Sequence, residues 1–238
     1  SALYVNGYVP TSVCRPSLAT ILTGQYPHHH GVFFNHPPPG LKTMQGFNMA
    51  EWRAARAETN RFMRDSATLP RVLAKYGYAS FQAGKHWEGD FRNCGFTDGM
   101  TLNEPSKEPA YGNRKVRDGG VAHGNGDAGL NIGRNTMQPV FNLIEIHRSQ
   151  PFLLWYAPFI PHGTFDGPAH YRKPFENHPG VPENMIGYYG EITRLDDTVG
   201  ELIRFINQLQ LTRSTLFVFA ADNGFRPTAK RSSNGKFE

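Results

Sequence analysis

The hydrophobic pattern of this chain alternates between short apolar runs and segments with helical spacing. Three runs rich in apolar residues, 78–83, 151–157 and 214–221, predict buried strands. Each run leads into a loop of polar or glycine residues, which is how a parallel α/β sheet presents functional groups at its edge. The pattern therefore predicts an α/β fold whose strand ends carry the chemistry.

Segments with helical spacing lie between the predicted strands. One helix is predicted to begin after Thr68, a candidate N-cap, and to end by Gly77. A second helix carries Val140 and Ile144 just ahead of the second strand. The longest periodic segment runs from about residue 183 to residue 211 and predicts a long packing helix.

Two adjacent carboxylates, Asp196 and Asp197, lie on this long predicted helix. Paired carboxylates are a possible metal site in general. Their position in mid-helix, beside a regular apolar stripe, instead favours solvation or pairing with Arg194. We therefore expect both aspartates to lie on the surface.

The composition is that of a globular protein of 238 residues, enough for one large α/β domain or two small ones. The net charge of +5 has no dense basic run behind it, so we expect no nucleic-acid partner, and a basic site for anionic substrates fits as well. No apolar run approaches the length of a membrane span, and the first residues lack the features of a signal peptide.

The two cysteines, Cys14 and Cys94, have a spacing that indicates neither a disulfide framework nor a zinc site. Cys14 begins a short predicted helix with Pro16 in its first turn and Gly24 at its end. The apolar face of this helix is formed by Leu18, Ile21 and Leu22. This geometry aims Cys14 at the positive end of the helix, as for a reactive cysteine, and the alternative is a small buried hydrophobe.

The segment that follows Cys14 resembles the cysteine-type signature of the sulfatases, Cys-x-Pro-Ser-Arg followed by a run that ends in Thr-Gly. The resemblance continues through residues 24–31 and recurs in four later places. Leu18 stands where most members carry arginine, and a bacterial branch shares the Cys-Arg-Pro-Ser-Leu-Ala-Thr form. On these motifs the chain is identified as similar to type I, formylglycine-dependent sulfatases of the alkaline phosphatase superfamily.

The resemblance implies an α/β sandwich with a large, mainly parallel central sheet flanked by helices. It also implies that residues 1–238 form a partial sulfatase catalytic domain, without the N-terminal metal-binding strand and the C-terminal subdomain of relatives. Bacterial members suggest a sulfated carbohydrate or small molecule as substrate and a periplasmic or secreted location.

For the chemistry, the resemblance implies that a maturation enzyme oxidises Cys14 to formylglycine, whose hydrate supplies the nucleophile. It further implies a calcium ion bound by Asp222, Asn223 and the modified Cys14. Oxygen ligands at the end of the 214–221 strand suit a hard cation. A simple turn is the alternative for Asp222-Asn-Gly224, because these residue types favour turns.

Lys85 follows the first predicted strand in the phrase Gly-Lys-His-Trp. It matches the lysine that contacts sulfate and the nucleophile in relatives with Gly-Lys-Trp-His. His86 and Trp87 are interchanged relative to that pattern, so the resemblance carries a role over to Lys85 more firmly than to His86. Arg15 is a candidate substitute for the cation that Leu18 does not supply.

Two further residues complete the predicted site. His162, in the loop after the second strand, matches the histidine near the leaving oxygen in relatives, and surface exposure is the alternative. Lys230 resembles a lysine found shortly after Asp-Asn-Gly in the family, with Lys236 as the second choice.

Two other functions remain open at the level of sequence. A phosphoester or phosphonate hydrolase of the same superfamily uses a similar nucleophile, but phosphoryl transfer favours a second metal or extra cations. A non-catalytic sulfated-glycan binder, whose cysteine is never matured, is suggested by Leu18.

Overall fold

The computed structural model of the chain describes residues 2–37, 46–104, 114–122, 124–226 and 233–234. In chain order, its first elements are α1 (Cys14–Thr23), α2 (Pro27–His30), α3 (Met49–Arg64), α4 (Leu69–Ala74), β1 (Ala79–Gly84), the 3₁₀ turn η2 (Phe91–Cys94), β2 (Asp98–Gly99), β3 (Arg114–Lys115) and β4 (Val121–Ala122). They are followed by η3 (Asp127–Asn131), α5 (Gln138–His147), β5 (Phe152–Ala157), α6 (Ala169–Arg172), η4 (Lys173–Phe175), η5 (Glu183–Met185), α7 (Ile186–Gln208), η6 (Thr212–Ser214), β6 (Phe225–Arg226) and β7 (Ser233–Asn234).

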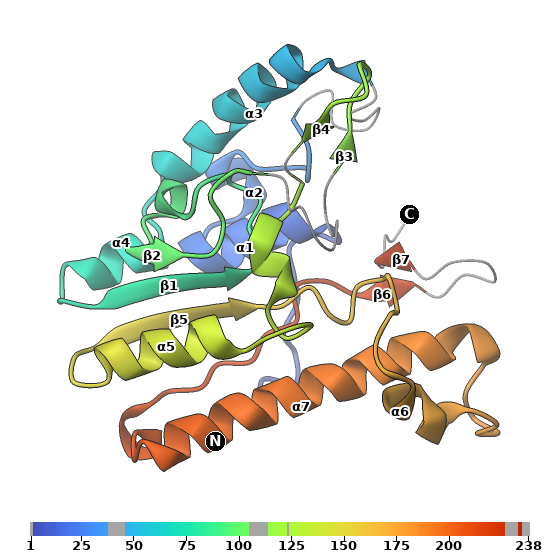
Figure 1. The fold of residues 1–238 in the computed structure, drawn as a ribbon. Helices are drawn as coiled ribbons and strands as arrows, with labels where there is room; N and C mark the ends of the chain where they lie inside the picture. Colours follow the sequence, from blue (N-terminus) through green and yellow to red (C-terminus); the bar gives the residue numbers. More distant parts are fainter. Residues whose placement is uncertain (1, 38–45, 105–113, 123, 227–232, 235–238) are drawn as a thin grey trace.

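The central sheet of the described residues has the order β2-β1-β5, and both pairings are parallel. Along the β1–β5 pairing, Ala79 lies opposite Phe152 and Gly84 lies opposite Ala157, so the two strands end side by side. Figure 1 shows this sheet between two groups of helices. The α/β class and the first two predicted strands are confirmed.

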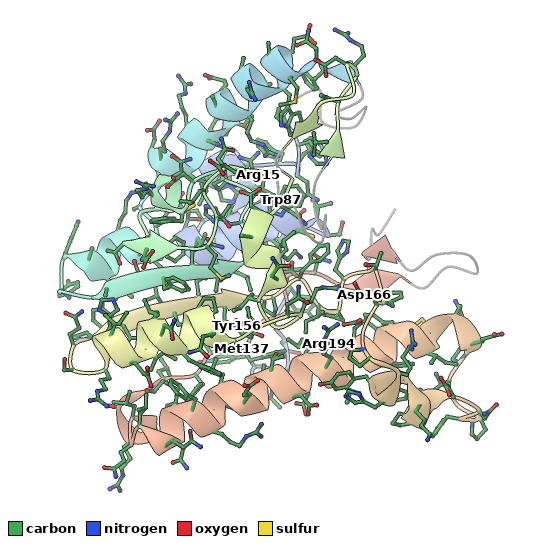
Figure 2. The ribbon with its side chains drawn as sticks, in the orientation of Figure 1. Arg15, Trp87, Met137, Tyr156, Asp166 and Arg194 are labelled. Carbon is green, nitrogen blue, oxygen red and sulfur yellow. The ribbon has the colours of Figure 1, made fainter. Side chains whose placement is uncertain are left out.

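The two faces of the sheet are covered by different helices. On one face, β1 residue Phe81 packs in a core with Val140 and Ile144 of α5 and with α7, and Tyr156 of β5 joins this side. On the other face, Leu153 and Trp155 of β5 pack on a cluster built from α1, α3 and η2. Figure 2 shows Tyr156 and Met137 on the α7 side of the sheet. The alternation along β5 is the period of two expected for a strand buried on both faces.

The helix predictions are confirmed in position, with two local corrections. α1 ends where Gly24 adopts a left-handed conformation, with φ of 67°. Ile21 does not join the buried face of α1, since it is 38% exposed while Leu18 and Leu22 are buried. Thr68 precedes α4, but its hydroxyl donates to the carbonyl of Cys94 at 2.6 Å and does not cap the helix.

The long helix α7 follows the predicted segment, and both aspartates on it are exposed as expected. The ion-pair partners of Arg194 among the described residues are Glu191 and Asp166, in place of the two aspartates of α7.

The third predicted strand is wrong for the described part of the chain. Residues 215–221 are extended without a strand partner there, and Leu216, Val218 and Phe219 are 86%, 80% and 82% exposed. Figure 1 shows them in the red segment that runs from the end of α7 toward β6. A strand is defined by backbone hydrogen bonds to a neighbour, so an apolar sequence alone does not make one.

Candidate active site

Three residues far apart in sequence meet at the start of α1. Cys14 is the first residue of this helix and is buried. Lys85 directly follows β1, and its Nζ donates to Oδ2 of Asp222 at 2.9 Å. The same ammonium hydrogen-bonds to the side chain of Cys14. The structure thus joins three of the predicted site residues in one contact network.

Asp222 is attached to this network through its backbone as well as its carboxylate. The hydroxyl of Ser17, in the first turn of α1, donates to the carbonyl oxygen of Asp222. The contact joins the end of the extended segment to the positive end of the helix that carries Cys14. Negative charge that develops beside Cys14 would therefore meet both the helix terminus and the Lys85 cation.

The charge on Lys85 is supported by its neighbours. Burial is the largest influence and opposes the ammonium form, but interaction with Cys14 and Asp222 outweighs it and raises the pKa of Lys85 above its usual value. Lys85 is consequently a buried cation at neutral pH, in contact with the candidate nucleophile.

The loops after β1 and β5 leave the sheet in contact with each other. The backbone N–H of Lys85 donates to the carbonyl of Ala157 at 2.6 Å. Gly84 has a φ of +96°, and a Cβ placed on it would lie 1.9 Å from that same carbonyl oxygen. Glycine therefore permits the approach that places Lys85 and the 158–162 loop at one edge of the sheet.

His162 lies in this loop, at the same edge as Lys85. Its ring stacks on Phe159, with ring centroids 4.4 Å apart, and its Nδ1 is 2.7 Å from the carbonyl oxygen of Gly163. Arg134, which sequence reasoning did not single out, holds the loop by donating to the carbonyl oxygens of His162 and Thr164 at 2.8 and 3.1 Å. The catalytic role of His162 stays a prediction.

Asp222 and Asn223 have the donor chemistry that a hard cation requires. The backbone N–H of Asn223 donates to Oδ1 of Asp222 at 2.9 Å, and its Nδ2 donates to the carbonyl of Gly224 at 2.9 Å. This leaves its Oδ1 buried, with no hydrogen-bond partner among the described residues. An orphaned amide oxygen beside a carboxylate fits calcium. The described residues contain no cluster of three or more His, Cys, Asp or Glu, and a calcium role for Asp222 and Asn223 stays a prediction.

Comparison with known proteins identifies the fold and the family. The sequence model of the family described as Sulfatase matches residues 2–238. The chain belongs to the sulfatase family. Its α/β fold is shared by a sulfatase-like protein of Bacteroides thetaiotaomicron, reported with the metabolism of multiple glycosaminoglycans, at a TM-score of 0.60 and 16% identity over 94% of this chain and 55% of that one.

Curated relatives include two mammalian sulfatases. Arylsulfatase A of Bos taurus is 28% identical over 98% of this chain and 46% of its own length. N-acetylgalactosamine-6-sulfatase of Homo sapiens is 24% identical over 99% of this chain and 46% of its own length. The chain thus spans less than half of these two relatives.

Arg15 does not replace the missing sulfatase arginine at the nucleophile. Its Nε and Nη2 donate to the two carboxylate oxygens of Glu88 at 2.7 and 2.6 Å, and Nη2 also donates to the carbonyl of Thr59 at 3.1 Å. Successive residues of a helix point about 100° apart, so Cys14 and Arg15 serve different sides of α1. Burial is the largest influence on Glu88 and raises its pKa. The charge and hydrogen bonds of Arg15 outweigh burial and hold the pKa of Glu88 below its usual range.

Leu18 and Trp87, the two departures from the sulfatase pattern, are packed together. With Cys14 they form one buried apolar cluster, and Trp155 of β5 packs against it. His86 is not part of this cluster: its ring packs against Phe96, and its Nε2 lies 3.4 Å from the carbonyl oxygen of Asp90. The side of Cys14 that arginine would charge in relatives is therefore apolar here.

Sequence reasoning missed Ser17, which lies within the Cys-Arg-Pro-Ser-Leu-Ala-Thr phrase, and Glu88, which directly follows the Gly-Lys-His-Trp phrase. Their proximity to Lys85 and to Cys14 along the chain was the available signal. Lys230 and Lys236 lie outside the described residues.

Proposed function

We propose that this chain carries the catalytic centre of a sulfuric ester hydrolase that uses a formylglycine derived from Cys14. The observation that carries the proposal is the contact of Cys14 with Lys85, which in turn holds Asp222. A buried cation beside the nucleophile and an oxygen-rich turn beside that cation suit a reaction at a sulfonyl group. Membership of the sulfatase family supports the same chemistry.

Formylglycine at position 14, once formed and hydrated, would supply one hydroxyl for attack on sulfur and a second hydroxyl whose deprotonation would restore the aldehyde and release sulfate. His162 would protonate the leaving oxygen as its bond to sulfur breaks. Lys85 neutralises charge on the sulfonyl oxygens throughout. Asp222 and Asn223 would hold calcium, which supplies Lewis-acid polarisation of the sulfate oxygens when bound.

The proposed substrate is a sulfated carbohydrate. One relative is named for a sulfated amino sugar, N-acetylgalactosamine 6-sulfate, and the net charge of +5 suits an anionic ligand. A periplasmic or secreted location agrees with such a substrate, and a relative from Caenorhabditis elegans is named as a putative extracellular sulfatase. In the part of the chain that the structure describes, no helix has the length and apolarity to cross a bilayer. The proposed protein partner is a formylglycine-generating maturation enzyme.

The decisive experiment measures the mass of the peptide that spans Cys14 and the turnover of two aryl esters. We expect formylglycine in place of the thiol, hydrolysis of aryl sulfate in preference to aryl phosphate, and loss of hydrolysis in Cys14→Ala. Cys94→Ala is the matched control, because Cys94 is the other buried thiol and lies in a separate cluster. A strong preference for phosphate supports the phosphoesterase alternative, and glycan binding with an unmodified thiol supports the non-catalytic one.

His162 is proposed to protonate the leaving oxygen. General acid catalysis typically increases the rate by about 10²–10⁴-fold, and the increase is largest for a poor leaving group. His162→Ala should therefore slow a sugar sulfate far more than a nitrophenyl sulfate, whose leaving group needs little protonation. Equal losses on the two substrates would place His162 in sulfate binding or in structure.

A further inference from the structure

A cavity outside the candidate active site lies beside Arg56, whose guanidinium also faces the ring of Trp87. It has a volume of about 260 Å³ and is bounded by α3, by η2, by the loop after β2 and by β4. Its cationic lining residues are Arg53, Arg56 and Arg64, which recur at intervals of three and eight along α3 and so share a face of that helix. Among the described lining residues there is no aspartate or glutamate, so the cavity is positively charged.

Arg56 is the buried cation of this cavity. It is 3% exposed, and its Nη1 donates to the carbonyl of Asn35 at 3.2 Å. Its Nε and Nη2 are buried without a hydrogen-bond partner among the described residues. The nearest buried carboxylate, Glu88, is already engaged by two N–H groups of Arg15. Burial, with a further contribution from Arg15, lowers the pKa of Arg56 to about 9 against the opposing charges of Glu88 and Asp127.

Amide side chains complete the lining. Asn60, Asn93 and Asn103 line the cavity, and Oδ1 of Asn60 is buried without a partner among the described residues. Amides both donate and accept hydrogen bonds, as sugar hydroxyls do. Trp52 of α3 also lines the cavity, and the Arg56 guanidinium lies 4.9 Å from the centroid of its ring. The cavity thus combines unpaired cationic donors with groups suited to hydroxyls.

The cavity is linked to the nucleophile through one side chain. Trp87 belongs to the buried cluster of Cys14, and its ring centroid lies 6.0 Å from the Arg56 guanidinium. In the view of Figure 2, Trp87 and Arg15 lie between α3 and the sheet. Trp87 therefore packs against Cys14 and faces a residue that lines the cavity, Arg56.

We propose that this cavity is a subsite for an anionic sugar unit of the glycan, bound through a carboxylate or a second sulfate. This inference rests on the proposed function for the class of glycan. The arginine fork binds the paired oxygens of either anion with two parallel hydrogen bonds. The amides hold the ring hydroxyls, and the sulfate to be cleaved lies at Cys14.

The test is calorimetric binding to the Cys14→Ala protein, which does not turn over the ester. Three probes are used: a monosulfated disaccharide with a uronate carboxylate, the same disaccharide with the carboxyl reduced to an alcohol, and the reduced form with a second sulfate. Arg53→Ala and Arg64→Ala carry the test, because both residues are exposed and their removal leaves the buried packing intact. Arg61→Ala is the matched control, since Arg61 lies on the same helix, is paired with Glu58 and does not line the cavity.

We expect the reduced monosulfated probe to bind most weakly and the two dianionic probes more tightly. Each of Arg53→Ala and Arg64→Ala should weaken a dianionic probe by about 5- to 10-fold, the value of one charge-assisted hydrogen bond at a partly hydrated site. Arg61→Ala should change no affinity. Tighter binding of only the carboxylate probe assigns a uronate, and of only the disulfated probe assigns a second sulfate.

Three results would overturn the subsite. They are equal affinity for all three probes, no measurable binding, and an affinity that neither Arg53→Ala nor Arg64→Ala changes. Hydrolysis of a small aryl sulfate by the wild-type protein is measured in parallel and does not need the cavity. Its absence, together with anion-selective binding, overturns the proposed function and leaves the cavity assigned, so the two failures are distinguishable.

Discussion

Two buried ion pairs flank the start of α1, and they differ in how completely they are satisfied. Arg15 and Glu88 form a closed pair, with two N–H groups on two carboxylate oxygens and side chains that are 2% and 5% exposed. Lys85 and Asp222 form a more open pair, at 2.9 Å, with side chains that are 8% and 28% exposed. Both cations are close to Cys14 along the chain or in space, but only Lys85 contacts it.

The difference follows from the two kinds of cation. A guanidinium has a rigid fork that matches one carboxylate, so Arg15 is occupied by Glu88 and by the Thr59 carbonyl. An ammonium is a point charge with three donors, so Lys85 contacts Asp222 and Cys14 together. The closed pair should therefore contribute mainly to stability and the open pair mainly to catalytic rate.

The largest expected effect is on the closed pair. Glu88→Ala leaves the Arg15 guanidinium buried without its carboxylate and should lower the free energy of unfolding by about 3–5 kcal/mol. Urea denaturation measures it. The control is Glu58→Ala, which removes an exposed partner of Arg61 and should cost about 0–1 kcal/mol. Similar losses in the two variants would contradict the distinction between the pairs.

Loss of the open pair should lower the rate of sulfate ester hydrolysis. Lys85→Ala removes the cation next to Cys14 and should lower kcat for an aryl sulfate by about 10²–10³-fold, as for loss of one charge-stabilising donor. Lys75→Ala is a control, because Lys75 is an exposed residue at the end of α4. A Lys85→Ala protein with nearly full activity would remove Lys85 from the mechanism.

The closed pair should also give a characteristic pH dependence. The pKa of Glu88 is lowered from its usual value of 4.5, so its contribution to stability is fully present above that pH and is lost as pH falls through the lower, folded-state pKa. Wild-type protein should lose about 1.4 kcal/mol for each unit of that shift. Glu88→Gln should lack this part of the acid dependence in urea titrations between pH 7 and the acid limit. Parallel wild-type and variant curves would contradict the assignment.

The smallest expected effect on stability belongs to Asp222. Asp222→Asn keeps an oxygen acceptor for Lys85 at a partly exposed position, so the free energy of unfolding should change by about 1 kcal/mol or less. Loss of the carboxylate should nevertheless reduce bound calcium, measured by elemental analysis, and activity with it. Calcium that is retained in full would assign Asp222 to a turn.

The strands show what could be predicted from sequence. Residues 151–157 and 214–221 are both apolar runs that end in polar loops, but only the first becomes a strand, β5, because β1 offers its edge. A local pattern reports which residues avoid water and does not report whether a neighbouring backbone is available. The helices were predicted better, since their hydrogen bonds lie within the segment itself.

The site shows the same limit. Cys14, Lys85 and Asp222 could be singled out because each lies within a recognisable motif, at the start of a helix, directly after a strand and after an apolar run respectively. The partner of Arg15 could not, because Glu88 is 73 residues away and reaches it only through the fold. The packing of Leu18 on Trp87 is likewise a contact between two departures from a pattern, which no single motif reveals.

Gly84 has no Cβ, and this allows the loops after β1 and β5 to lie against each other. In a saturation mutagenesis library, every replacement of Gly84 would place a Cβ against the carbonyl oxygen of Ala157. We therefore expect no replacement at this position to be tolerated, whatever the chemistry of its side chain. Gly24 has a similar left-handed backbone, with φ of +67°, but a Cβ there would meet no atom within 4 Å. Replacements at Gly24 should survive at a reduced level, and the contrast would separate backbone strain from steric exclusion.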